Sequence, residues 1–93
     1  MAYAERSSID LTPRILAICT PLVKHPEDLH VTRVSDDRKN QSYLITCRAD
    51  DVGKLLGRDG MISDALRTIV NIALRPARKK ASLKFEANNP ESR

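Results

Sequence analysis

Four residues near the middle of the chain, Gly57-Arg58-Asp59-Gly60, have the composition of a turn that holds a phosphate group. Glycine reaches positive φ without steric cost and lets another backbone approach closely. A Gly-x-x-Gly turn at a helix N-terminus presents unpaired N–H groups and the positive end of a helix dipole, which is where anions bind. Lys54 and Arg58 add positive charge beside it. By itself, this loop fits a nucleotide site as well as a nucleic-acid site.

The residues around the loop narrow these alternatives. No Gly-Lys-Ser/Thr sequence ends the loop and no predicted strand leads directly into it, which disfavours a P-loop. A short helix is predicted over 52–56, after Asp50 and Asp51, either of which can cap it. A longer helix is predicted over 61–74, and its apolar residues recur at helical spacing. Its predicted buried stripe is Ile62, Ala65, Leu66, Ile69, Val70 and Ala73.

The remaining elements follow from the same kind of pattern. A first helix is predicted over 12–24, with Thr12 as its cap, Pro13 in its first turn and a kink or split at Pro21. Alternating segments at 29–34 and 42–48, joined by a polar turn, predict a hairpin, and 81–86 predicts a last strand. The second segment has Tyr43, Ile45 and Cys47 on one face.

This order of elements predicts an α+β fold. The last predicted strand is separated from the second by two helices, so a crossover can place it parallel to that strand. The apolar stripes then all face one layer, with three helices packed on one face of a three-stranded mixed sheet. A chain of 93 residues makes one small domain, which we place at 11–86. Residues 1–10 are predicted to be a flexible extension and residues 87–93 a disordered tail.

Charge is distributed unevenly along the chain. Residues 52–85 carry eight basic and two acidic side chains, a net +6, whereas residues 1–51 have a net charge of −1. A strongly positive half is typical of a surface that binds nucleic acid or an acidic partner. An ordinary solubilising face is the alternative. Aromatic residues make up only 3% of the chain, which argues against proteins that stack bases on an aromatic sheet.

Other function classes find little support. Cys19 and Cys47 are 28 positions apart with no histidine at ligand spacing, so we expect core residues and no metal site. No serine, cysteine or carboxylate stands in a catalytic pattern, so we expect no enzyme activity, no cofactor and no small-molecule substrate. No apolar run approaches the ~20 residues of a membrane span, and no signal peptide is present, which predicts a cytoplasmic protein.

The motif and its flanks resemble a KH domain of the type II order found in bacteria. The residues that carry the resemblance are Val52-Gly53-Lys54-Leu55-Leu56 before the loop, the loop itself, and Ile62 and Arg67 after it. The resemblance covers about 11–85. The segment 22–28 (LVKHPED) and the compact length make the chain similar to the stand-alone KhpA-type (YlqC-like) KH proteins.

The resemblance implies that the chain clamps about four nucleotides of single-stranded RNA with low sequence specificity, as an RNA chaperone or adaptor. The N–H groups of Gly57 to Gly60 would meet phosphates, and Lys54 and Arg58 would add charge. An apolar groove would hold the bases. The groove residues are Val52, Leu55 or Leu56, Ile62 and about 83–85, including Leu83. The peripheral phosphate contacts are Arg67, Lys79 and Lys80, and Arg38 and Lys39 would extend the site.

Two questions stay open at this point. Asp59 either weakens RNA binding, or its side chain points to solvent or caps the following helix; we favour the second. The chain is also a candidate protein-interaction module. KhpA-type proteins form homodimers and pair with a larger KhpB (Jag)-type KH protein, with links to cell-envelope growth and division, and a dimer would offset the weak affinity of one domain.

Overall fold

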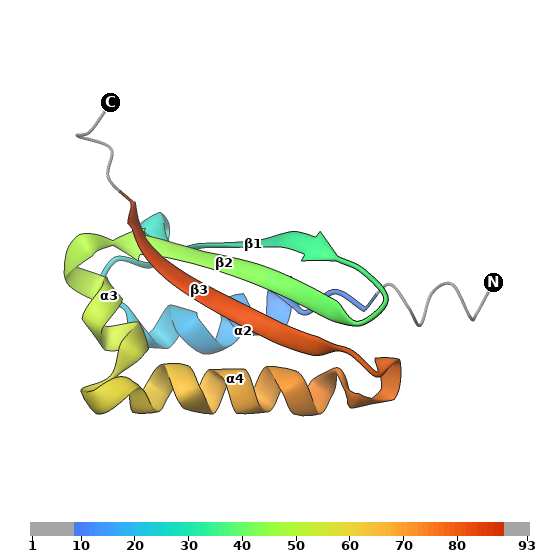
Figure 1. The fold of residues 1–93 in the computed structure, drawn as a ribbon. Coiled ribbons are helices and arrows are strands. Elements are labelled where there is room, and N and C mark those ends of the chain that lie inside the picture. The colour runs from blue at the N-terminus through green and yellow to red at the C-terminus, as the bar shows by residue number, and fades with distance from the viewer. Residues whose placement is uncertain (1–8, 89–93) are drawn as a thin grey trace.

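A computed structural model describes residues 9–88 of the chain. Three helices, α2 (Thr12–Cys19), α3 (Ala49–Leu56) and α4 (Met61–Ala73), accompany three strands, β1 (His30–Asp36), β2 (Asn40–Arg48) and β3 (Lys80–Asn88). The strand order is β1-β2-β3, with β1 antiparallel and β3 parallel to β2. The helices cover one face of the sheet (Figure 1). The predicted α+β fold, with three helices on one face of a mixed sheet, is confirmed.

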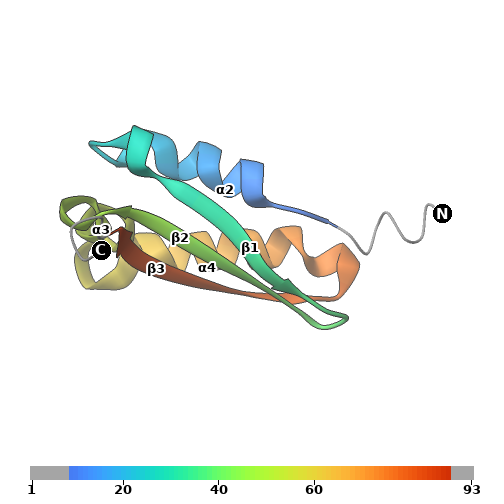
Figure 2. The same cartoon turned by 90° about the horizontal axis from the view of Figure 1, so that it is seen from above.

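The core lies between the sheet and these helices. Along β2, burial alternates strictly, so Gln41, Tyr43, Ile45 and Cys47 face the helices as the pleat requires. Seen from above, α2 lies alongside β1, and α4 lies beneath β2 and β3 (Figure 2). Both cysteines are buried and free, and burial raises the pKa of the Cys19 thiol to about 11. The expectation that they serve as core residues is confirmed.

The first helix differs from its prediction at both ends, since the helical turns end at Leu22 and Val23 is extended, whereas the prediction ran to residue 24. As expected, Pro21 splits it: α2 ends at Cys19, and the 3-10 turn η1 (Thr20–Leu22) follows. Thr12 was predicted to cap the helix, and this is wrong, because Leu11 occupies the cap position without a side-chain bond. The carboxylate of Asp10 instead accepts the backbone N–H of Thr12 at 3.0 Å.

The buried stripe of α4 also differs. Leu66 and Val70 are buried as predicted, but Ala65 and Ile69 are exposed, and Ser63 is buried in their place. Ser63 fits because its hydroxyl donates to the carbonyl of Gly60 at 3.0 Å. The buried residues of α4 are therefore 63, 66 and 70, with Ala73 partly buried against the core, and the predicted apolar stripe was too wide.

The strands are longer than predicted. β1 continues to Asp36 and β2 begins at Asn40, so the hairpin turn is short. β3 includes residues 87 and 88, which the sequence assigned to the disordered tail. The rest of that tail, and residues 1–8 of the predicted N-terminal extension, lie outside the described residues.

Candidate nucleic-acid interface

The 57–60 loop joins α3 to α4, and three of its four residues have positive φ. Gly57 has φ 75° and ψ 175°, Asp59 has φ 55°, and Gly60 has φ 76°. The conformation of Gly57 belongs to a region that is essentially restricted to glycine. Asp59 lies in the left-handed region, which aspartate tolerates better than most residues. The two glycines therefore fix a sharp, rigid turn.

Hydrogen bonds inside the turn decide which N–H groups remain for a ligand. The N–H of Gly57 donates to the carbonyl of Gly53 at 2.9 Å, and that of Gly60 donates to Gly57 at 3.2 Å. Within residues 9–88, the backbone N–H groups of Arg58 and Asp59 donate to no protein acceptor. All four N–H groups of the loop were expected to be available to a ligand, but only the two central ones are.

Close packing against α4 explains why position 57 must be glycine. A Cβ at Gly57 would lie 2.6 Å from Cγ1 of Ile62 and 2.9 Å from the backbone nitrogen of that residue. Real Cβ atoms do not approach so closely. A Cβ at Gly53, inside α3, would meet nothing within 4 Å. Of the two glycines before Arg58, only Gly57 is required by the local structure.

The charged side chains of the loop are open to solvent. Lys54, Arg58 and Asp59 are all exposed, and none forms an ion pair with another described residue. Asp59 does not cap α4, since the cap residue Gly60 receives no side-chain bond. That part of the expectation for Asp59 is wrong. Its carboxylate points into solvent beside the two cations and lowers the positive charge of the loop.

Half-buried apolar side chains flank the loop. Val52, Leu56 and Ile62 are partly exposed, whereas Leu55 is fully buried in the core. The sequence left Leu55 and Leu56 as alternatives for the groove wall, and burial selects Leu56. On β3, Phe85 is half-buried, but the side chain of Leu83 is 5% exposed and belongs to the core.

The outer edge of β3 offers backbone groups at the same place. The side chain of Asn71 accepts the N–H of Ala81 at 2.8 Å and donates to its carbonyl at 3.4 Å, so the Ala81 amide faces away from β2. Because strands have a period of two, Leu83 and Phe85 direct their backbone groups to that same edge. The side chain of Leu83 is thus not available to a ligand, and only its backbone groups are.

The three predicted peripheral cations lie in different places. Arg67 is half-buried on α4 and pairs with Asp64 at 3.0 Å. Lys80 is exposed at the start of β3. Since α4 spans 13 residues, or about 20 Å at 1.5 Å per residue, Lys80 lies far from the loop. Lys79 is 7% exposed and pairs with Asp36 at 2.5 Å. Its buried ammonium is not a surface contact.

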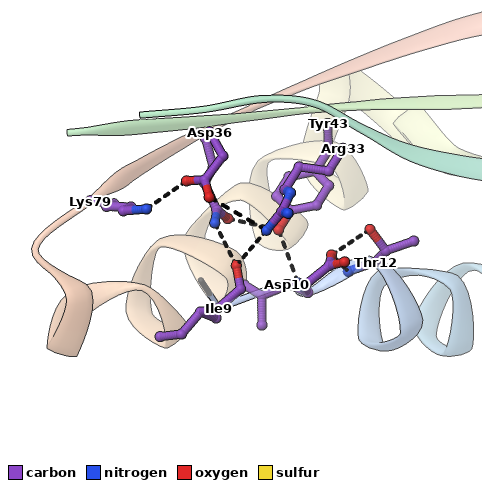
Figure 3. Close-up of polar contacts among 9 residues, drawn as sticks. Ile9, Asp10, Thr12, Arg33, Asp36, Tyr43 and Lys79 are labelled. Carbon is purple, nitrogen blue, oxygen red and sulfur yellow. Dashed lines mark hydrogen bonds and ion pairs between the residues drawn. The ribbon is translucent and has the colours of Figure 1, made fainter. Parts of the chain in front are cut away.

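That ion pair belongs to a polar network which the sequence analysis missed (Figure 3). The guanidinium of Arg33 donates to the carbonyl of Ile9 at 3.0 Å and approaches Asp36 at 3.6 Å. Burial has the largest single effect and raises the pKa of Asp36, but the hydrogen bonds from Lys79 and Gln41, together with the positive charges of Lys79 and Arg33, leave the net pKa lowered. The network joins the segment before α2 to the sheet. One residue could have indicated this network from the sequence: Gln41 is a polar residue that continues the alternation of buried positions along β2.

Asp51 forms the second buried polar anchor, close to the start of α3. It was predicted as a possible cap of its own helix, and this is wrong. Its carboxylate is fully buried and accepts the N–H groups of Lys24 at 3.0 Å and His25 at 2.9 Å. Burial has the largest single effect and raises its pKa, but these two hydrogen bonds, together with the electrostatic effects of His25 and Lys54, leave the net pKa lowered. Asp51 therefore fixes the segment after η1 to the helix that leads into the loop.

Comparison with known proteins adds the family context. Residues 14–85 match the family model described as KhpA/KhpB, KH domain. The chain is 36% identical over 71 residues to RNA-binding protein KhpA of Bacillus subtilis, covering 76% of this chain and 86% of that protein. It is 39% identical over 56 residues to RNA-binding protein KhpA of Listeria monocytogenes, covering 60% of this chain and 72% of the relative. No solved structure matches. Within residues 9–88, no helix is long and apolar enough to cross a membrane.

Proposed function

Because the chain belongs to the KhpA/KhpB KH-domain family, we propose that it binds single-stranded RNA and clamps about four nucleotides at the 57–60 loop. The observation that carries the proposal is the loop itself. Among residues 9–88, two adjacent backbone N–H groups have no protein acceptor, and two exposed cations that form no ion pair lie beside them. Relatives in this family carry the name of an RNA-binding protein.

The surfaces beside the loop provide contacts for both the phosphates and the bases of the RNA. Phosphates meet the N–H groups of Arg58 and Asp59, with Lys54 and the Arg58 side chain as counter-charges. Bases then lie against the half-buried Val52, Leu56 and Ile62. The outward backbone groups of β3 donate to and accept from base edges. Few side chains contact the bases in this arrangement, so sequence specificity is low, which suits an RNA chaperone or adaptor.

A charge series in the loop tests this function with changes of opposite sign. Arg58→Asp should weaken binding of a labelled 12-nucleotide single-stranded RNA by about tenfold or more at low salt, since it removes one phosphate contact and adds a repulsive charge. Asp59→Asn should tighten binding by about threefold, because it removes a negative charge and asparagine keeps the left-handed backbone. Fluorescence anisotropy across a salt series measures both.

Arg14→Asp is the matched control for this series. Arg14 is exposed on α2, away from the loop, and its substitution by aspartate changes the net charge by the same amount as Arg58→Asp. An Arg58→Asp variant that binds RNA as tightly as Arg14→Asp would contradict the proposal. Equal binding by Asp59→Asn and the parent would mean that Asp59 does not modulate affinity.

A stripe of exposed apolar residues on α4 favours a second, compatible role as a self-association module. Met61 is 65%, Ile69 49% and Ile72 50% exposed, and with the exposed Ala65 they lie on one side of the helix. Solvent-exposed apolar stripes of this kind mark protein contacts. We propose that two copies pair through this stripe, since one helix face can pack against itself across a two-fold axis. The link to a KhpB (Jag)-type partner and to cell-envelope growth remains a prediction.

Sedimentation tests the dimer. The parent is expected to sediment as a dimer at about 50 μM, and Ile69→Glu with Ile72→Glu should sediment as a monomer, because four buried charges would oppose each other. Val34→Glu is the control, since Val34 is 55% exposed and lies on β1 rather than on α4. A parent that stays monomeric at this concentration, or a control that dissociates equally, would contradict this interface.

A further inference from the structure

A second basic site lies at the end of α4 that is remote from the 57–60 loop. The turn η4 (Arg75–Ala77) and the first residues of β3 surround a hollow of about 540 Å³ there. Figure 1 places this turn and the loop at opposite ends of α4, with β3 running beside the helix between them. The residues that line the hollow are Asn71, Arg75, Arg78, Lys79, Lys80 and Ala81.

Three of the cations around this hollow have no acidic partner in the part of the chain that the structure describes, whereas Lys79 pairs with Asp36. Arg75, Arg78 and Lys80 are exposed, and no carboxylate of residues 9–88 lies within ion-pair distance of them. The hairpin tip between β1 and β2 brings a further cation close to the hollow. The backbone N–H of Lys80 donates to the carbonyl of Lys39 at 2.9 Å, so these two lysines are neighbours. The carboxylate of the nearby Asp37 accepts the backbone N–H groups of Lys39 and Asn40, and it forms no ion pair with a described cation.

The local structure holds these cations in place. Arg78 has φ 60°, a left-handed conformation that glycine adopts freely and arginine adopts with strain. The next residue, Lys79, is anchored inside by Asp36, and Asn71 holds both backbone groups of Ala81. With its flanks fixed in this way, the turn keeps Arg78 and Lys80 exposed at the rim. Strain retained by a non-glycine residue at a basic hollow is a mark of a binding site.

We propose that this hollow binds phosphates of the same RNA strand that the loop clamps, so that the RNA footprint extends past four nucleotides along α4. The inference rests on the proposed function of the loop. Its occupant follows from charge complementarity: an uncompensated group of arginines and lysines in an open hollow matches the repeating phosphates of a flexible strand. The two ends of α4 then act as two contact points on one RNA.

RNA length separates this proposal from the function of the loop. The variant Arg75→Gln with Lys80→Gln leaves the strained backbone at Arg78 untouched. Arg14→Gln with Lys24→Gln is its control with the same net charge, because both of these cations are exposed away from the loop and the hollow. Binding of oligouridine of 5 and 12 nucleotides is measured between 50 and 200 mM salt. Over this range the parent should lose about sevenfold more affinity for the 12-mer than the variant, since two phosphate contacts are absent from the variant. The 5-mer should bind the parent and the variant alike.

A direct readout of contact accompanies the affinities. In ¹⁵N-labelled parent, the 12-mer should shift the backbone amide signals of 75–81 as well as those of the loop, and the 5-mer only those of the loop. If the pocket variant binds the 12-mer with the salt dependence of the parent, or the 75–81 signals stay unmoved, the proposal is overturned. If Arg58→Asp leaves binding of both oligonucleotides unchanged while the pocket variant weakens the 12-mer, the loop function fails and the second site stands.

Discussion

Replacing Gly57 by alanine is expected to destabilise the fold by about 3 kcal/mol and to abolish RNA binding at the loop. Two costs contribute to this figure. The conformation at φ 75° and ψ 175° is essentially closed to residues with a Cβ, and the new methyl group would overlap Ile62 at 2.6 Å. Relief requires α3 and α4 to separate, and that movement displaces the N–H groups of Arg58 and Asp59.

Gly53→Ala is the matched control, because the same methyl group is added one turn earlier. A Cβ there meets nothing within 4 Å, and the residue lies inside α3, so the substitution should stabilise the helix by about 0.5–1 kcal/mol. Urea denaturation and RNA anisotropy compare the pair. If Gly57→Ala and Gly53→Ala are equally stable and bind RNA equally, the loop is not the rigid turn described above.

The second large effect is expected at Asp51. Asp51→Asn should lower the Tm by about 5–10 °C at neutral pH, because one amide oxygen cannot accept both buried N–H groups and the amide nitrogen faces one of them. The neighbouring Asp50 is exposed, so Asp50→Asn should change the Tm by less than about 2 °C. Circular dichroism melting at pH 7 measures both variants.

Acid should remove most of this difference. The folded-state pKa of Asp51 lies below the ordinary value of 3.8, so its stabilising contribution is present above that pH and is lost as the pH falls through the lowered pKa. Asp36 and Asp10 have lowered pKa values as well, so the parent should lose stability below about pH 4. The Tm gap between the parent and Asp51→Asn should therefore narrow on acidification. A gap that stays constant down to pH 2.5 would contradict the assigned role of the carboxylate.

Much of the fold could be predicted from local pattern. Alternation in 42–48, helical apolar spacing in 61–74 and the disruptive effect of Pro21 are properties of short segments. The strand, the helix and the break lie where these patterns predicted, although α4 buries a narrower stripe than expected. The loop was found for the same reason. Two glycines three positions apart, after a short helix and before a long one, indicate a tight turn without reference to distant segments.

Burial and pairing that depend on contacts between distant segments could be known only from the structure. The sequence predicted Asp51 as a possible helix cap and Lys79 as a phosphate ligand. Both residues are buried instead, and they bind partners 27 and 43 positions away, respectively. Ile69 reads as core and is exposed, because only tertiary packing determines how wide a stripe of α4 the sheet covers. The sequence by itself determined where the glycine turn lies and what charge surrounds it. Tertiary structure decided which N–H groups and which cations remain available there, because hydrogen bonds and ion pairs within the fold use the rest.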